Sequence, residues 1–587
     1  MISENQFTVL HACKKAPGLS LEELSARTGL APDTALATVE KLAADGLLTV
    51  NDYCLTAEGD AALAPFKVDN AVIMAAGLGS RFVPLSLEKP KGLYSVRGEV
   101  LVERQIRQLQ EAGVRDITLV VGYMKEQFFY LQEKFGVKLV VNPDYFRFNN
   151  TSTLMLVKDR LANTYICCSD NYFTINPFES HVYRAYYAAR YAEGKTDEYC
   201  LDLDADGRIR KVSVGGSNCW FMAAQVFFSR EFSEKFVPIL EREYALEPTK
   251  HELWEDVYAR HTDTLSMYIR KYDAGILQEF DSLDDLRLFD PYYINNCDSA
   301  ILKNICNYFS CKQEDISDIR PLKKGLTNVS LRFTLNNQKY IYRHPGVGTE
   351  EYISRQNEYR SMQTAEKLGL DKTFLYMDVQ EGWKLSRYIE NSRIMDYHNE
   401  DDVKKALRLV RKLHDARVPA DYEFNMWKMC LGYIDKIQKR GRADFADFTQ
   451  LFERMREVYN FAESDECPKV LCHCDTYAPN FLVHDDEIEL IDWEYSGSDD
   501  PCADLGTFIC CSDYSYDEAM RVIALYYGHT PTTQELRHAI AYVAIAAYQW
   551  FLWAIYQESM GKSVDDYLLI WYQSAKLYAE KALEMYR

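Results

Sequence analysis

The chain has 587 residues, 16 cysteines and a formal net charge of −21. Its length predicts about three or four domains, and its acidic balance disfavours tight, general binding to nucleic acid. No uninterrupted apolar run approaches the roughly 20 residues of a membrane helix. Because the sequence has neither a C-x-x-C pair nor a signal-peptide pattern, a disulfide framework and a zinc ribbon are both disfavoured, and we expect a cytoplasmic protein.

Residues 1–66 have the pattern of a small helical module. We expect helices at residues 5–15, 20–29 and 31–46, a hairpin at 47–56 and a closing helix at 57–63. Ser20 and Glu23 have the spacing of a capping box. This order resembles a winged helix-turn-helix, whose third helix usually binds DNA. Here that helix carries the single lysine Lys41 among acidic residues, so a regulatory or protein-contact role is favoured over operator binding. A module that only packs on the next domain remains open.

Residues 68–295 alternate between apolar strands and amphipathic helices. We expect strands at residues 70–76, 116–123, 137–143 and 164–171, with helices at 101–113 and 125–136 between them. This pattern predicts a doubly wound, Rossmann-like α/β domain, in which ligands bind at the carboxyl ends of the strands.

Residues 297–587 follow a different pattern. A hairpin of β-branched and aromatic residues is expected at 326–346, and helices dominate the rest of the chain, including an aromatic helix at 542–557. The segment therefore predicts a small β-rich lobe followed by a larger helical lobe.

The first strand of the α/β segment ends in a glycine loop. The loop and the residue before it are Ala76, Gly77, Leu78, Gly79, Ser80 and Arg81. Glycines let backbone N–H groups approach a phosphate closely. The loop lacks the Gly-Lys-Ser/Thr of a Walker motif and the third glycine of a dinucleotide loop.

With the downstream segments "EKPKGL", "VGYMKEQF", "FNNTSTLMLVK", "CSDNYF" and "QEFDSLDDL", this loop resembles the bacterial CTP:phosphocholine cytidylyltransferases over nearly all of residues 70–290. The resemblance implies that a phosphate oxygen of phosphocholine attacks the α-phosphorus of CTP and that pyrophosphate leaves. Such catalysis rests on positioning and on charge stabilisation. The glycine loop and Arg81 would bind the triphosphate. Lys91 would neutralise charge between the reactants, and it is preferred to Lys89 because the family's lysine follows a proline.

The same resemblance implies a Mg²⁺ ion that bridges the phosphates. Asp170, at the end of a predicted strand, would be its first ligand. Glu255 and Asp256 in "HELWEDVY" compete for the second position, and a solvated helical face is the alternative for both.

The acceptor's quaternary ammonium group calls for aromatic faces. Tyr199 stands where the family usually has a tryptophan, while Trp254 and Glu279 are further candidates. The tyrosine keeps ethanolamine and aminoethylphosphonate open as alternatives to choline.

The run "LCHCDTYAPNFLVHDDEIELIDWEY" resembles the choline kinase and aminoglycoside phosphotransferase superfamily, which implies a two-lobed, protein-kinase-like α+β fold. Asp475 would accept the proton of the substrate hydroxyl, and Asn480 and Asp492 would hold Mg²⁺. Upstream, Arg343 would be the strand cation and Glu358 its ion-pair partner, while residues 323–330 resemble a phosphate-covering turn. A metal site built from Cys472, His473 and Cys474 is disfavoured because no second ligand pair matches it.

Trp550 and Trp553 lie three residues apart and therefore on one face of the predicted aromatic helix. A buried aromatic stripe would explain them, but choline kinases carry a matching W-x-x-W that cages the trimethylammonium group. By the same resemblance, Tyr516 or Tyr514 could close this cage, and Asp504 could contribute to it or orient the loop.

These observations predict a bifunctional enzyme that phosphorylates choline with ATP and then transfers CMP from CTP to phosphocholine, giving CDP-choline. The same two reactions on ethanolamine or aminoethylphosphonate are the alternative. A transcription regulator that senses a choline metabolite is a second alternative, which intact catalytic motifs and the acidic third helix disfavour.

Overall fold

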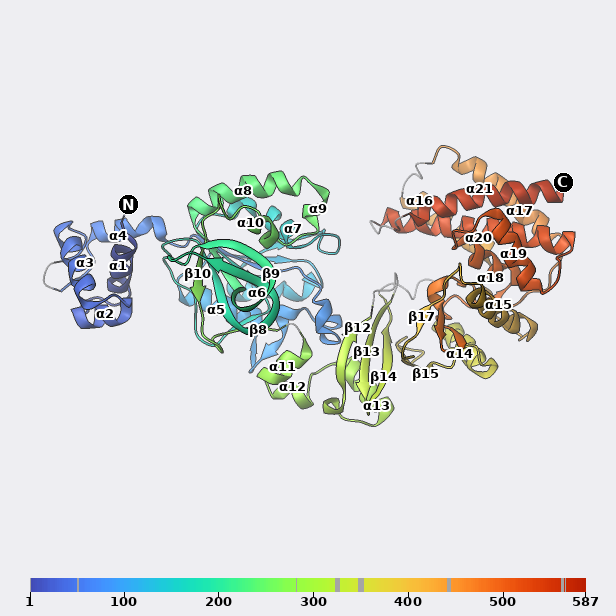
Figure 1. Ribbon diagram of the computed structural model, residues 1–587, viewed down its shortest axis with the longest axis horizontal. Coiled ribbons are helices and arrows are strands. Elements are labelled where there is room, and N and C mark those ends of the chain that lie inside the picture. Colours follow the sequence, from blue (N-terminus) through green and yellow to red (C-terminus); the bar gives the residue numbers. More distant parts are fainter. Residues whose placement is uncertain are drawn as a thin grey trace. The chain divides into compact units, whose positions relative to one another are not determined.

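The computed structural model describes residues 2–49, 52–280, 282–322, 328–346, 353–440, 445–560, 564 and 566–587. The chain divides into two compact units, Met1–Asp315 and Ile316–Arg587 (Figure 1).

The first unit begins with the helices α1 (Glu4–Lys15), α2 (Leu21–Thr28), α3 (Pro32–Ala44) and α4 (Ala57–Leu63). Their apolar faces meet in a small core that includes Phe7, Leu24 and Leu42. The predicted capping box is confirmed, because the Ser20 side chain accepts from the Glu23 N–H while the Glu23 carboxylate accepts from the Ser20 N–H. An isolated bridge joins Leu48 and Leu55, and residues 50–51 of the expected hairpin lie outside the described residues. The winged helix stays a prediction.

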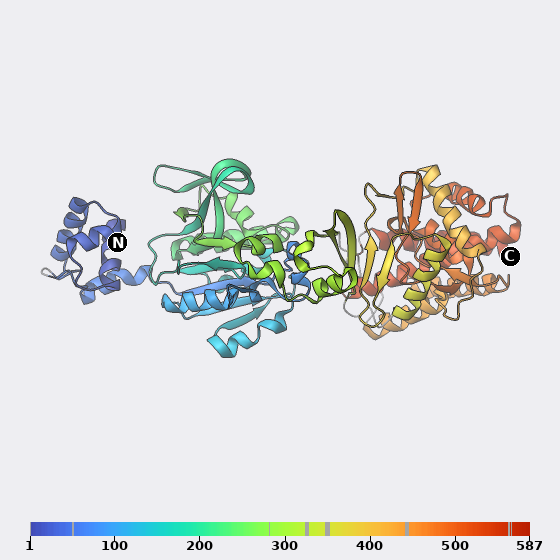
Figure 2. The same cartoon turned by 90° about the horizontal axis from the view of Figure 1, so that it is seen from below.

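A seven-stranded sheet forms the centre of the first unit, in the order β10-β8-β9-β6-β1-β4-β5. The strands are β1 (Asn70–Ala75), β4 (Ile117–Val121), β5 (Lys138–Val141), β6 (Thr164–Cys168), β8 (Tyr186–Leu203), β9 (Ile209–Phe228) and β10 (Tyr268–Lys271). β6, β1, β4 and β5 are parallel, and β9 runs antiparallel to β6. Figures 1 and 2 show β8 and β9 as a long, curled two-stranded arm, in green.

Both faces of this sheet are covered, which confirms the predicted doubly wound fold. Ala71 and Ile73 of β1 pack into one core, while Val72 packs into the other, as expected for a buried parallel strand. The covering helices are α5 (Leu101–Glu111), α6 (Tyr130–Phe135), α7 (Asn150–Leu156), α8 (Arg230–Tyr244), α9 (Glu247–Lys250) and α10 (Trp254–Ala259). Met74 of β1 pairs with Cys168 of β6, so the loops that follow these two strands begin side by side.

Short elements complete the first unit. They are β2 (Ser95–Val96), β3 (Glu99–Val100), β7 (Asn171–Phe173), β11 (Leu277–Glu279), α11 (Leu283–Phe289), α12 (Tyr292–Asn295) and α13 (Ala300–Phe309). β11 runs antiparallel to β7 and pairs Glu279 with Asn171. Helix α13 follows the predicted boundary at residue 297, yet it is compact with this unit, and its Ile301 N–H donates to Glu88 at 3.1 Å.

The second unit opens with an antiparallel sheet in the order β12-β13-β14-β16-β15. Its strands are β12 (Ser317–Pro321), β13 (Val329–Leu335), β14 (Gln338–His344), β15 (Phe374–Met377) and β16 (Lys384–Arg387), and helix α14 (Arg355–Leu368) accompanies them. The predicted hairpin is confirmed by β13 and β14, which pair from Val329–His344 to Leu335–Gln338.

A helical lobe follows. Its helices are α15 (Glu400–Asp415), α16 (Met426–Arg440), α17 (Phe448–Glu463), α18 (Pro501–Cys510), α19 (Tyr516–Tyr527), α20 (Thr533–Ser559) and α21 (Tyr567–Tyr586), and its short strands are β17 (Arg393–Ile394), β18 (Val470–Cys472), β19 (Phe481–His484), β20 (Glu487–Leu490) and β21 (Gly497–Asp499).

Helix α20 is the centre of this lobe. It packs against α16, α17, α18 and α21. Gly506 of α18 permits a close crossing, since a Cβ there would lie 2.4 Å from the Tyr542 carbonyl oxygen. Among the described helices, α20 alone is long and apolar enough to cross a membrane, and 89% of its apolar window is buried inside the protein, as in the core helix of a folded domain.

Candidate active sites

A pocket of about 530 Å³ lies at the carboxyl ends of β1, β5 and β6. The structure gathers nine of the predicted site residues in its wall: Ala76, Gly77, Leu78, Gly79, Ser80, Arg81, Lys91, Asp170 and Glu279. This is the edge of the sheet at which doubly wound domains bind ligands.

Lys91 and Asp170 meet in this pocket. The Lys91 ammonium donates to the Asp170 carboxylate at 3.0 Å. Two glycines permit the approach, because a Cβ on Gly79 would lie 3.0 Å from the Lys91 side chain and a Cβ on Gly92 would lie 2.7 Å from Ser169. Gly79 also has a φ of +60°, which disfavours other residues. Among the described residues that line the pocket, Lys91 is present and Lys89 is not.

Glu255 and Asp256 lie behind the pocket, since neither is among the described lining residues. Asn150, which does line it, donates to the Glu255 carboxyl group at 3.2 Å, and the Tyr187 hydroxyl donates to the same group at 3.0 Å. Burial raises the pKa of Glu255 to about 7. Asp256 instead accepts from the Leu253 N–H at 3.0 Å, at the start of α10. The choice between the two as metal ligand stays open.

The carboxylates around β6 affect the pKa of the Cys168 thiol. Burial raises the pKa of Cys168 well above its ordinary value, and the negative charges of Asp170, Glu279 and Glu255 raise it further. Cys168 lines the pocket together with Asp170 and Glu279.

Two predicted acceptor residues lie elsewhere in the part of the chain that the structure describes. Trp254 is 1% exposed and packs in the core against Tyr187 and Phe228, with ring centroids 5.8 and 5.2 Å away. The Tyr199 hydroxyl donates to Asp256 at 2.8 Å. The sequence interpretation missed several polar residues of the pocket wall: Asn142, Tyr145, Arg147, Asn149, Asn150 and His251. The asparagine pair in "FNNTSTLMLVK" was their one visible signal.

The second unit has a pocket of about 150 Å³. Its wall contains the predicted residues Arg343, Asp475, Asp492, Trp550 and Trp553, together with Asn328, Ser330, Tyr477, Glu494, Tyr495, Cys511 and Trp571. A carboxylate suited to proton transfer and a set of aromatic rings thus line one cavity.

Asp475 is buried at the end of a strained loop. The Asn480 side chain donates to its carboxylate at 2.9 Å. Burial and the nearby charge of Asp492 raise the pKa of Asp475 to about 8. The preceding residue, Cys474, and Asp492 itself have φ values of 65° and 69°, an uncommon conformation that concentrates at functional sites.

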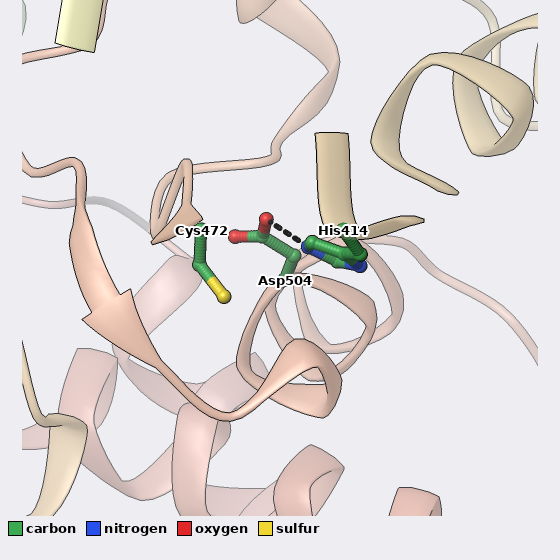
Figure 3. Close-up of side chains that lie close together, drawn as sticks. All are labelled: His414, Cys472 and Asp504. Carbon is green, nitrogen blue, oxygen red and sulfur yellow. Dashed lines mark hydrogen bonds and ion pairs between the residues drawn. The ribbon is translucent and has the colours of Figure 1, made fainter. Parts of the chain in front are cut away.

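Asp504 anchors this loop, and Figure 3 shows its contact with His414. Its carboxylate accepts from the backbone N–H groups of His473 at 2.9 Å and Cys474 at 2.6 Å, and it lies 2.9 Å from Nε2 of His414. Asp504 is 0% exposed and is absent from the described pocket wall. Its geometry is therefore that of a loop anchor rather than of a residue in contact with a head group.

Both ring nitrogens of His473 have other partners, which argues against a metal site built from Cys472, His473 and Cys474. Nε2 lies 3.0 Å from the Ile491 carbonyl oxygen, and Nδ1 accepts from the Asp475 N–H at 3.2 Å. The Cys472 thiol, which Figure 3 shows beside Asp504 and His414, donates to the Asp500 carbonyl at 3.4 Å.

Two cations contact the carboxylates at the acidic end of the pocket. Arg343 forms ion pairs with Asp492 and Glu494, and the predicted ion pair with Glu358 is present at 3.6 Å. Lys384, which the sequence interpretation missed, lies closer to Glu358, at 3.0 Å. Burial alone would raise the pKa of Asp492, but the charges of Arg343 and Lys384 hold it well below its ordinary value.

Three tryptophans form the aromatic part of the wall. The ring centroids of Trp550 lie 5.5 Å from Trp553 and 5.7 Å from Trp571, and those of Trp553 and Trp571 are 6.2 Å apart. Trp571 comes from α21 and was missed in the sequence. Tyr514 and Tyr516 do not appear in the described wall: the Tyr514 hydroxyl donates to the Tyr397 carbonyl at 2.6 Å, and Tyr516 packs on Tyr578. Most of the turn at 323–330, residues 323–327, lies outside the described residues.

Comparisons with known proteins match both units. Residues 319–549 match the choline/ethanolamine kinase family model, and residues 71–164 match the MobA-like NTP transferase domain. A choline-phosphate cytidylyltransferase of Streptococcus pneumoniae is 36% identical over 38% of this chain and 98% of its own length. A 2-aminoethylphosphonate cytidylyltransferase of Lancefieldella rimae is 37% identical over 38% of this chain and 93% of its own. Protein LicA of Haemophilus influenzae is 25% identical over 42% of this chain and 95% of its own length.

Proposed function

Because the chain belongs to the choline-phosphate cytidylyltransferase family and also carries a choline/ethanolamine kinase domain, we propose that it makes CDP-choline in two steps. The second unit phosphorylates choline with ATP, and the first unit transfers CMP from CTP to the resulting phosphocholine. The observation that carries the proposal is the kinase pocket, in which Asp475 and three tryptophans line one cavity. Choline needs both features, since it combines a hydroxyl group with a trimethylammonium group that offers no hydrogen-bond donor.

In the kinase reaction, Trp550, Trp553 and Trp571 hold the ammonium group by cation–π contact. Asp475 accepts the hydroxyl proton as the choline oxygen bonds to the γ-phosphorus of ATP and the bond to ADP breaks. The elevated pKa of Asp475 suits proton transfer near neutral pH. Asp504 keeps the loop in place through its backbone N–H bonds, so it acts as a positioning residue.

In the transferase reaction, the glycine loop and Arg81 bind the triphosphate of CTP. Lys91 stabilises charge where the anionic acceptor approaches the α-phosphorus, and Asp170 holds the Lys91 ammonium in that place. The acceptor oxygen is already anionic, so this step needs no general base. An oxygen of phosphocholine forms a bond to the α-phosphorus, and the bond to pyrophosphate breaks.

Both sites offer oxygen donors of the kind that Mg²⁺ prefers. Asn480 and Asp492 would hold the ion in the kinase site. In the transferase site Asp170 would be the first ligand, and Glu255 or Asp256 the second. Bound there, Mg²⁺ neutralises phosphate charge. Asp170 and Glu279 both line the transferase pocket, so carboxylate oxygens are available to a cation there.

A primary-amine head group is the second candidate for the transferase unit. The relative that uses 2-aminoethylphosphonate is as similar as the one that uses phosphocholine. Tyr199 stands in place of a tryptophan, but it is absent from the described pocket wall and its hydroxyl pairs with Asp256, so it does not by itself select a head group. The three tryptophans of the kinase pocket favour choline.

We also propose that residues 1–66 form a winged helix with a regulatory or protein-contact role in a cytoplasmic enzyme. Lys41 of α3 has the acidic neighbours Asp33 and Glu40, which weakens contact with DNA phosphates. Gel-shift binding to its own promoter region would favour the transcription regulator instead.

To test the proposal, the purified chain is incubated with Mg²⁺ and a panel of substrates, and the products are identified by mass spectrometry. Choline and ethanolamine are offered with ATP; phosphocholine, phosphoethanolamine and 2-aminoethylphosphonate are offered with CTP. We expect choline and phosphocholine to give the highest kcat/KM. Preference for the primary amines in both reactions would select the alternative head group, and no turnover of any substrate would refute the proposed function.

A further inference from the structure

Arg343 and Lys384 are cross-strand neighbours. β14 and β16 run antiparallel, and these two residues are directly opposite each other in the register. Directly opposed residues project from the same face of a sheet. Both cations therefore reach the carboxylates of Glu358 and Asp492.

Lys384 and Arg343 contact different carboxylates most closely. The Lys384 ammonium lies 3.0 Å from Glu358 and 3.5 Å from Asp492. Arg343 is 3.6 Å from Glu358, but it hydrogen-bonds to Asp492 and Glu494. Lys384 is thus the closer of these two partners of Glu358.

The pocket separates the two cations as well. Arg343, Asp492 and Glu494 line it, whereas Lys384 and Glu358 are absent from its described wall. The side chains of Lys384 and Arg343 are both 9% exposed and that of Glu358 is 1% exposed, so the pocket wall, and not burial, distinguishes the two cations. Arg343 is therefore the cation with access to a ligand, and its planar fork suits phosphate oxygens.

Removal of Lys384 would leave Glu358 short of positive charge in a buried place, which is costly. Arg355 lies 3.0 Å from the other Glu358 oxygen. Arg343, already 3.6 Å away, is the cation placed to move toward the vacated side. Arg343 would then be withdrawn from the pocket.

We propose that Lys384 is a positioning residue of the kinase: it neutralises Glu358 and so leaves the Arg343 guanidinium to bind the phosphates of ATP. This inference rests on the proposed kinase function. Lys384 is a second and closer partner of Glu358, beside the Arg343 ion pair that the sequence pattern predicts.

The test is a double-mutant cycle on the full chain with Lys384→Met, Glu358→Gln and the double variant. Lys384→Arg tests rescue by charge. Lys339→Met is the matched control, since Lys339 lies on the same sheet and pairs at the surface with Glu390 at 2.9 Å. The readouts are kcat, the KM values for ATP and choline, and the Kd for ATP.

We expect Lys384→Met to raise the KM and Kd for ATP by about 10- to 100-fold while the KM for choline changes by less than about 2-fold. The double variant should bind ATP at least about 5-fold more tightly than Lys384→Met, because a neutral amide at position 358 no longer withdraws Arg343. The Kd for ATP of Lys384→Arg should stay within about 3-fold of the wild-type value. The Kd for ATP of Lys339→Met should equal the wild-type value.

The proposal would be overturned if the double variant lost ATP affinity by the sum of the losses in Lys384→Met and Glu358→Gln, because additive losses would mean that Lys384 itself binds ATP. Unchanged ATP binding in Lys384→Met would overturn it too. Should that variant fail to fold, Lys384→Gln takes its place in the same cycle. Wild-type chain without choline kinase activity would instead refute the proposed function, so the two failures are distinguishable.

Discussion

The Lys91 ammonium donates to the Asp170 carboxylate at 3.0 Å across 79 residues of sequence. The contact follows from the sheet, because Met74 near the end of β1 pairs with Cys168 at the end of β6. The glycine loop after β1 and the Asp170 turn after β6 therefore begin at one edge. A cation and an anion meet there, at the edge where we propose that the triphosphate and the acceptor phosphate come together.

Replacing Lys91 by alanine should reduce cytidylyl transfer by about 10²-fold or more, because the variant lacks the preorganised positive charge between the acceptor phosphate and the triphosphate of CTP. Choline phosphorylation should stay normal, so phosphocholine accumulates. The readout is CDP-choline formation from phosphocholine and CTP. Lys89→Ala is the matched control, because Lys89 is absent from the described pocket wall. Normal transfer in Lys91→Ala together with loss in Lys89→Ala would contradict the assignment.

Asp475→Asn should reduce choline phosphorylation by about 10²- to 10⁴-fold, because an amide cannot accept the hydroxyl proton. Transfer of CMP to added phosphocholine should not change, since that site lies in the other unit. ADP release and CDP-choline formation are measured separately. Asp486→Asn, at an exposed position of the same lobe, should leave both rates unchanged. Equal loss of both activities in Asp475→Asn would show that the sites are not separate.

Trp550→Ala should raise the KM for choline by roughly 2- to 30-fold, the loss of a cation–π contact of about 0.5 to 2 kcal/mol. Ethanolamine keeps three N–H donors that water can satisfy, so it should suffer less. The measurement is the ratio of kcat/KM for the two substrates. Trp427→Phe, a buried change at a ring that stacks on Tyr459, serves as the control. An unchanged ratio would mean that Trp550 is a core residue.

The second unit should lose stability as the pH rises from neutral to about 10. His538 lies 2.9 Å from Asp500 and 3.2 Å from Asp465. Burial alone would lower its pKa, but hydrogen bonds with Asp500 and Cys467 raise it to about 10. An unfolded histidine titrates near 6.5. The ion pairs of protonated His538 therefore contribute fully to the free energy of unfolding below that pH, and this contribution is lost as the pH rises toward 10.

Thermal unfolding of wild type and of His538→Gln between pH 6.5 and 10 measures this effect. Each pH unit in which only the folded state holds the proton corresponds to about 1.4 kcal/mol. The wild-type midpoint should therefore fall more steeply than that of the variant. Parallel curves would contradict the assigned ion pairs.

The sequence patterns predicted the elements that local chemistry encodes. The glycine loop, Lys91 and Asp170 follow buried strands, and one pocket contains all of them. Asp475 and the Trp550–Trp553 pair likewise lie in one cavity. Apolar runs revealed the buried strands because a doubly wound sheet is covered on both faces.

Sequence spacing could not predict the features that depend on the register between strands or on how deeply a side chain is buried. Lys384 meets Glu358 because β16 pairs with β14 in one particular alignment, and Trp571 comes from a different helix than Trp550. Trp254 has the residue type of an acceptor site, yet it lies in the core because α10 packs its first residue inward. Residue type therefore indicated the chemistry, but the packing determined which residues reach the pocket.

The central claim is that one chain carries both reactions at separate sites, and a product time course tests it most directly. Wild type, Lys91→Ala, Asp475→Asn and an equimolar mixture of the two variants are each given choline, ATP, CTP and Mg²⁺. We expect wild type to form phosphocholine and then CDP-choline, Lys91→Ala to stop at phosphocholine, Asp475→Asn to form neither, and the mixture to recover CDP-choline. Failure of wild type to convert choline, or of the mixture to recover CDP-choline, would contradict the claim.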